Sequence, residues 1–245
     1  YYTIADKIVV RDDSSYNLLS KYNKTYLLPD VSFLLPYVLE IKPGALQTQQ
    51  GKRSREVILI LRNLEFMGKN LEQKYANLLE MLVKDGFSVT LLILSKVPTR
   101  ISYEARVADD KLLADQIISK VDKKYSEGIN IVEFDFWNIL NVHKVLNLIS
   151  SSDVVVSNRL HGCILATLLS KKLIILSYAE KMNAYAKQIG LENGSVLDIE
   201  GDDLDERMLY NNISKLLSTN KINYDINKVE NMVKESLILI FKVFR

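Results

Sequence analysis

Six short apolar segments alternate with helical segments from residue 56 onward, and this alternation constrains the fold more than any other feature of the chain. The apolar segments cover residues 56–62, 88–94, 130–135, 153–158, 173–177 and 195–199. Apolar residues recur at helical spacing between them, at 70–84, 110–121, 139–150 and 180–189 and after Arg159. Nearly continuous apolar strands that helices connect are typical of a parallel sheet covered on both faces. The sequence therefore predicts an α/β, doubly wound, Rossmann-like domain.

The turn after the fourth apolar segment places Arg159 and His161 where a strand becomes a helix. Free backbone N–H groups, the positive end of the helix dipole and a guanidinium favour phosphate or carboxylate there. We expect Ser157 or Asn158 to cap the helix, and His161 adds a group that titrates near neutral pH. Ligands of doubly wound sheets bind beyond the carboxyl ends of the strands, where Arg62 also lies. We therefore predict an anion site at this edge of the sheet.

The residues before this domain indicate a second, smaller unit. We expect a strand at 6–11, a helix at 14–22 that Ser14 caps, and a strand at 25–28. A stretch with Pro43, Gly44 and several basic residues is typical of an interdomain linker. The predicted division is an amino-terminal remnant (1–36), a linker (37–55), a carboxyl-terminal Rossmann-like domain (56–222) and a closing helix (223–245).

The closing helix has one apolar face, which includes Val229, Val233 and Phe241. Such a face favours a helix that packs across the domains. Basic residues such as Lys234 leave a peripheral contact with a membrane open as the alternative. We expect no membrane-spanning segment, because no stretch is long and apolar enough.

Composition excludes several classes of partner and site. The 32 Lys and Arg residues balance 30 Asp and Glu residues among 245, so no global charge favours nucleic acid. The single cysteine, Cys163, excludes an intramolecular disulfide and favours core packing and a cytoplasmic location, with the inner face of the membrane as a variant. The two histidines fall on different elements, and no Cys or His cluster has metal-ligand spacing, so we expect no metal site.

Four blocks in order along the chain carry a family resemblance. An Arg-Leu-His-Gly turn at 159–162 precedes a Tyr-x-x-Lys element at 178–181, and upstream an Arg-Asp-x-x-Ser block starts at Arg11 and a Pro-Asp-x-x-Phe block at Pro29. Together they resemble the polysaccharide pyruvyl transferase family. The resemblance implies a glycosyltransferase B-like arrangement of two Rossmann-like domains facing a cleft. Because Tyr1 opens the chain close to a strand that lies well inside the family's amino-terminal domain, we expect that domain to be incomplete here.

The resemblance also implies site residues for phosphoenolpyruvate, whose phosphate and carboxylate each suit an arginine fork. The expected donor-binding residues are Arg159, Leu160, Gly162, Arg62 and Arg11. Tyr178 and Lys181 are the expected substrate-binding residues, and His161 is the expected catalytic proton shuttle.

The implied reaction moves an enolpyruvyl group from phosphoenolpyruvate, a donor substrate that needs no cofactor, to a sugar. The product is a pyruvate ketal on a bacterial cell-surface glycan, such as an exopolysaccharide, capsule or cell-wall polymer, or on its lipid-linked oligosaccharide precursor. Two alternatives stay open. A nucleotide-sugar-dependent glycosyltransferase of the same fold would hold a diphosphate with Arg159 and Lys181. A non-catalytic scaffold of surface-glycan synthesis would bind a partner through the linker or the terminal helix.

Overall fold

A six-stranded parallel sheet forms the centre of the computed structural model, which describes residues 6–22, 24–39, 55–64, 70–95, 109–134, 139–199 and 204–243. Its strands are β3 (Glu56–Ile60), β4 (Ser88–Ile93), β5 (Ile129–Glu133), β6 (Val154–Ser157), β7 (Lys172–Ser177) and β8 (Val196–Asp198). Each overlaps one of the six predicted apolar segments. The prediction of an α/β parallel-sheet domain is therefore confirmed.

The order of the strands across the sheet is β5-β4-β3-β6-β7-β8. The chain starts at the centre with β3, adds β4 and β5 to one side, and then returns to place β6 on the other side of β3. In the register of the sheet, Ile58 of β3 lies beside Thr90 of β4 and Val155 of β6. The topological switch point therefore lies between β3 and β6, and ligands of such sheets bind beyond the strand ends at that point.

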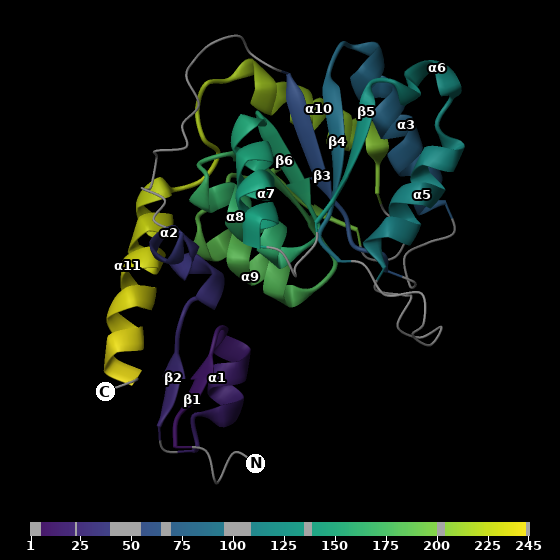
Figure 1. Ribbon diagram of the computed structural model, residues 1–245. Coiled ribbons are helices and arrows are strands. Elements are labelled where there is room, and N and C mark those ends of the chain that lie inside the picture. Colours follow the sequence, from purple (N-terminus) through teal and green to yellow (C-terminus); the bar gives the residue numbers. More distant parts are fainter. Residues whose placement is uncertain are drawn as a thin grey trace.

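Helices cover both faces of the sheet (Figure 1). Alternate side chains of β3 face opposite ways, so that Val57 and Leu59 join one core cluster and Ile58 and Ile60 join the other. The first cluster includes helices α3 (Leu71–Lys84), α5 (Asp110–Lys120) and α10 (Glu206–Ser218). The second includes α7 (Ile139–Ser151), α8 (Leu160–Leu168), α9 (Glu180–Gln188) and α11 (Ile226–Val243). A short helix, α6 (Lys123–Ser126), precedes β5.

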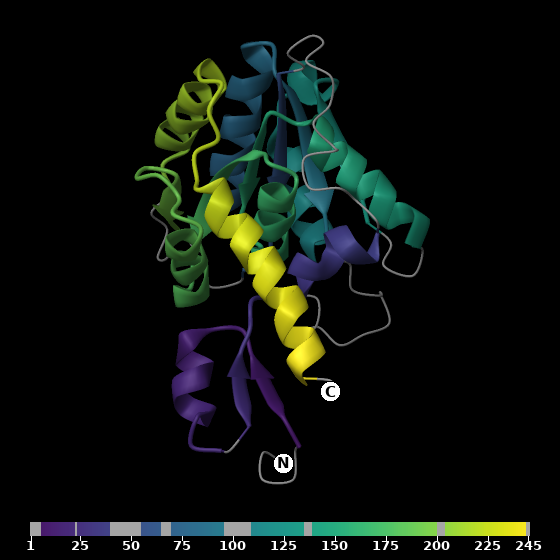
Figure 2. The ribbon, with the colours of Figure 1, turned by 90° about the vertical axis from the view of Figure 1, so that its left-hand side faces the viewer.

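A small unit built from the amino-terminal residues lies beside the end of α11 (Figures 1 and 2). It pairs two parallel strands, β1 (Ile8–Val10) and β2 (Thr25–Leu27), which α1 (Asp13–Leu19) connects. The carboxylate of Asp12 caps α1, because its Oδ1 accepts a hydrogen bond from the Ser15 backbone N–H at 2.7 Å. The prediction that Ser14 caps this helix is wrong, since the cap lies two residues earlier.

Two short helical turns, η1 (Val31–Leu34) and α2 (Leu35–Val38), follow the small unit and pack towards the main sheet. Phe33 is fully buried in the second core cluster, with its ring centroid 6.4 Å from that of Tyr185. The expected linker at 37–55 therefore begins inside a helix, and most of it, 40–54, lies outside the described residues. The domain boundary at residue 36 stays a prediction.

Helix α11 crosses the molecule and packs on η1 and α8 (Figure 2). Val229, Met232 and Val233 bury its first half in the second core cluster. Phe241, which the sequence placed on the packed face, is exposed instead. No helix in the described part of the chain has the length and apolar character needed to cross a membrane.

Candidate active site

The carboxyl ends of β3 and β6 are tied together by the side chain of Asn158. Its Oδ1 accepts a hydrogen bond from the Arg62 backbone N–H at 2.5 Å, and its Nδ2 donates to the Arg62 carbonyl oxygen at 3.2 Å. The Asn158 backbone N–H donates to the carbonyl oxygen of Ile60 at 3.2 Å. Strand β3 ends at Ile60, so Arg62 lies beyond the strand rather than at its last position. The amide of Asn158 therefore holds Arg62 at the switch point.

Tyr178 holds two cations beside this point. The Nη1 of Arg62 donates a hydrogen bond to the Tyr178 hydroxyl oxygen at 3.1 Å, and the guanidinium carbon lies 6.0 Å from the ring centroid. The Nζ of Lys181 lies 5.6 Å from the same centroid. Attraction between a cation and an aromatic ring favours both contacts. The structure therefore brings together three residues that the sequence assigned to the site from two distant segments.

Arg159 forms a buried ion pair that sequence reasoning missed. Its Nη2 lies 2.5 Å from Oδ1 of Asp110, and the exposed fractions of the two side chains are 19% and 1%. The other carboxylate oxygen of Asp110 accepts a hydrogen bond from the Ser95 backbone N–H at 3.1 Å, and the backbone of Asn63 donates another. Asp110 thus links the segments that follow β3, β4 and β6.

Burial raises the pKa of Asp110 above its ordinary value, and the Arg159 guanidinium and the backbone N–H donors offset this only in part. A local signal hid this residue. Asp109 is already the cap of α5, with its carboxylate accepting a hydrogen bond from the Lys111 backbone N–H at 2.9 Å. A second acidic residue in the first turn of a helix is explained by its favourable interaction with the helix dipole. The sequence therefore offered no reason to predict that Asp110 pairs with Arg159.

Helix α8 begins without the expected cap. Arg159 occupies the cap position, and no side chain in the described residues caps the helix there. The Oγ of Ser157 accepts a hydrogen bond from the Arg159 backbone N–H at 3.0 Å and donates to the Arg159 carbonyl oxygen at 2.9 Å. The prediction that Ser157 or Asn158 caps α8 is therefore wrong. The side chain of Ser157 bonds to the backbone of Arg159 instead, and that of Asn158 bonds to the backbone of Arg62.

Gly162 permits a close approach of α8 to the sheet. A Cβ at this position would lie 2.5 Å from the Ser157 Oγ and 3.0 Å from the Cδ1 of Ile60. Any larger residue would push the helix start away from β3 and β6. The structure therefore gives Gly162 a packing role, and its expected part in donor binding stays a prediction.

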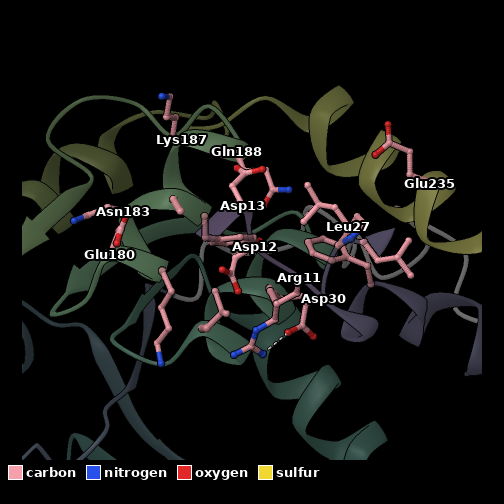
Figure 3. Close-up of a pocket in the computed structure, with 18 residues that line it drawn as sticks. Arg11, Asp12, Asp13, Leu27, Asp30, Glu180, Asn183, Lys187, Gln188 and Glu235 are labelled. Atoms are coloured by element: carbon pink, nitrogen blue, oxygen red, sulfur yellow. Dashed lines mark hydrogen bonds and ion pairs between the residues drawn. The ribbon is translucent and has the colours of Figure 1, made fainter. Parts of the chain in front are cut away.

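His161 and Arg11 meet at a shared carboxylate. The Nη1 of Arg11 donates to Oδ2 of Asp30 at 2.8 Å, and the Nε2 of His161 lies 3.9 Å from the same oxygen (Figure 3 shows the Arg11 contact). The imidazole is 61% exposed, whereas the Asp30 carboxylate is buried. Burial raises the pKa of Asp30, but hydrogen bonds from Ser32 and Arg11 and the charge of His161 outweigh it, so the net pKa lies below the ordinary value.

A cleft of about 790 Å³ opens beside this carboxylate, between the small amino-terminal unit and helices α8, α9 and α11 (Figure 3). Leu27 and Leu160 contribute apolar side chains to its lining, and Asn183 and Gln188 contribute amide groups. Five carboxylates and three cations belong to the described lining. This size is in the range of small-molecule sites.

The predicted site residues thus fall into two neighbouring groups. Arg62, Arg159 and Tyr178 lie beyond the strand ends, while Arg11 and Leu160 line the cleft. Lys181 belongs to both, because it contacts Tyr178 and also lines the cleft, and His161 stands next to Asp30.

Two other expectations concern Cys163 and metal binding. Cys163 is buried in the core, and burial raises the pKa of its thiol to about 12, which confirms core packing. The described residues contain no group of three or more His, Cys, Asp or Glu placed to hold a metal ion.

The family model for polysaccharide pyruvyl transferase matches residues 3–180. The chain belongs to this family. The matched segment includes Arg11, Asp30, Arg159 and His161, and Lys181 lies one residue beyond it. No curated protein sequence matches this pyruvyl transferase family member.

Solved structures that resemble this family member have a glycosyltransferase B-like fold. The UDP-GlcNAc 2-epimerase of Methanocaldococcus jannaschii matches with a TM-score of 0.60 at 14% identity, over 100% of this chain and 64% of the epimerase. The pneumococcal O-GlcNAc transferase GtfA, in complex with UDP and GlcNAc, gives 0.54 at 10% identity, over 100% of this chain and 47% of GtfA. TarM matches with a TM-score of 0.52 at 10% identity, over 98% of this chain and 43% of TarM. This chain therefore spans less than two thirds of the length of each of these structures.

Proposed function

We propose that this chain transfers the enolpyruvyl group of phosphoenolpyruvate to a sugar hydroxyl of a cell-surface polysaccharide or its lipid-linked precursor and closes a pyruvate ketal. One observation carries the proposal: two arginines of a pyruvyl transferase family member follow adjacent strands at the switch point of the sheet. The proposal keeps the cytoplasmic location expected from the sequence, with the inner face of the membrane as the place of a lipid-linked acceptor.

The donor fits the charges beyond the strand ends. Phosphoenolpyruvate carries a phosphate and a carboxylate, and each matches the planar fork of an arginine. Arg159 is held in place by Asp110, and the buried Nε–H of Arg62 has no hydrogen-bond partner in the described part of the chain. A bound oxyanion would satisfy such a donor. The exposed Lys181 adds a third positive charge beside the ring of Tyr178.

The acceptor fits the cleft, which is rich in groups that accept hydrogen bonds from sugar hydroxyls. Glu180, Asn183 and Gln188 offer polar atoms beside the apolar side chains of Leu27 and Leu160. Carboxylates outnumber cations in the described lining, which favours an uncharged sugar over an acidic one. The donor, bound by Arg62 and Arg159 beyond the strand ends, and the acceptor, bound in the cleft, would then meet near His161.

In the proposed reaction, His161 gives up one proton and takes one back, so that the imidazole ends the cycle in the protonation state in which it started. The imidazolium delivers a proton to C3 of phosphoenolpyruvate, and the first sugar hydroxyl adds to C2 and returns its proton to the imidazole. The second hydroxyl then attacks C2, the bond from C2 to the phosphate oxygen breaks, and phosphate leaves with the second hydroxyl proton. A positioned acid and base contributes about 10²–10⁴-fold in rate.

Calorimetric titration with phosphoenolpyruvate tests the donor. Arg159→Gln alone would leave the buried Asp110 carboxylate unpaired, so the informative variant is Arg159→Gln combined with Asp110→Asn. We expect the native chain to bind and this double variant to lose binding. Arg207→Gln, a change of an exposed arginine on α10, is the matched control and keeps it.

Two further measurements separate the outcomes. His161→Ala keeps donor binding and the fold, because the imidazole is largely exposed, but loses release of phosphate with a panel of sugars. A uridine or guanosine diphosphate that binds more tightly than phosphoenolpyruvate would instead favour a nucleotide-sugar glycosyltransferase. Absence of binding by every donor would contradict the proposal.

A further inference from the structure

Asp30 is a structural junction between three parts of the molecule. Its Oδ1 accepts a hydrogen bond from the Ser32 backbone N–H at 3.0 Å and so caps η1. Its Oδ2 accepts from Arg11, which follows β1, at 2.8 Å and faces the Nε2 of His161 on α8 at 3.9 Å. The carboxylate is buried, so these partners fix its orientation. One oxygen of Asp30 therefore faces the imidazole from a rigid position.

A carboxylate beside one ring nitrogen determines which nitrogen carries the proton in a neutral imidazole. Hydrogen bonds and the guanidinium of Arg11 lower the pKa of Asp30, so it is ionised at neutral pH and acts only as an acceptor. Asp30 also lies near the buried hydroxyl of Tyr185, which shares a hydrogen bond of 2.6 Å with Thr167. Asp30 therefore favours a proton on Nε2 of His161 and leaves the lone pair on Nδ1.

We propose that Asp30 is a positioning residue that holds the Nε2–H of His161, so that Nδ1 is the atom that exchanges the proton with the substrates. This inference rests on the proposed function of His161 as the proton shuttle. The role requires the 3.9 Å separation to shorten to a hydrogen bond in the complex with substrates, as active-site contacts commonly do. Arg11 then acts by fixing Asp30, and the amino-terminal unit and α8 form one catalytic assembly.

The test is Asp30→Asn in a His143→Gln background. His143 is exposed on α7 and is the other of the two histidines in the chain, so its removal leaves a single imidazole to observe. Asparagine caps a helix about as well as aspartate, so η1 keeps its cap. We expect nitrogen-15 spectra of the ring to show the Nε2–H form in the parent and a mixture of both tautomers in Asp30→Asn. With turnover established, we expect kcat to fall by about 10²-fold with KM unchanged.

Asp205→Asn is the matched control, because Asp205 caps α10 in the same way as Asp30 caps η1. It leaves the tautomer and kcat at parental values. If Asp30→Asn behaves like this control in both measurements, Asp30 does not position His161. A changed tautomer with parental kcat would overturn the role of Nδ1. If the native chain binds no phosphoenolpyruvate, the proposed function fails, and the ring spectra still decide whether Asp30 orients the imidazole.

Discussion

Arg159 has two physical roles, and any substitution of it changes both. It is the first candidate for an oxyanion contact, and it also neutralises the buried carboxylate of Asp110. Removing one partner of a buried pair leaves an uncompensated charge, which is more costly than the pair itself is stabilising. Loss of activity in a single Arg159 variant therefore does not by itself demonstrate a contact with substrate.

We expect Arg159→Gln to lower the free energy of unfolding by about 3 kcal/mol at neutral pH. Burial already raises the pKa of Asp110 in the native chain, and loss of the guanidinium raises it further. In mildly acidic solution Asp110 is therefore protonated in the folded variant more than in its unfolded state. The loss of unfolding free energy relative to the native chain then becomes smaller as the pH falls towards about 5. Denaturant unfolding at both pH values measures this. A deficit that does not change with pH, or that Asp110→Asn does not relieve in the double variant, would contradict the explanation.

The start of α8 depends on close packing rather than on a cap. Gly162→Ala places a methyl group against Ser157 and Ile60, so we expect a loss of about 1–3 kcal/mol of stability. Helix propensity alone predicts the opposite sign, because alanine is favoured over glycine by about 1 kcal/mol in a helix. Denaturant unfolding reads the sign directly. A stabilised variant would show that α8 can shift away from the strands without cost.

Phe33 joins the small amino-terminal unit to the main domain. It is fully buried between the second core cluster and Tyr185, so Phe33→Ala should cost about 3–5 kcal/mol. Val31, on the same turn, is 69% exposed, and Val31→Ala is the control, with a change within about 0.5 kcal/mol. Unfolding curves with limited proteolysis of the amino-terminal unit measure both. Equal losses would mean that Phe33 does not anchor the unit.

At the scale of the whole molecule, the sequence determined the sheet and the edge at which the predicted site residues Arg62 and Arg159 lie. Apolar runs alternating with helices allow few solutions other than a parallel sheet covered on both faces, because each apolar face must be buried. Parallel strands share one carboxyl edge, so Arg62 and Arg159 had to lie on it, although they are far apart along the chain. Tyr178 follows the next strand, β7, and reaches Arg62 for the same reason.

Only the tertiary structure decided which charges pair across that edge. Asp110 could be read from the sequence only as a residue in the first turn of a helix, and Asp30 only as part of a family block, because local patterns report local partners. Arg159 meets Asp110 and His161 faces Asp30 because separate loops converge at the strand ends and at the cleft. A periodic pattern fixes which face of an element is buried, but the partner of a buried charge depends on chain segments that meet only after folding.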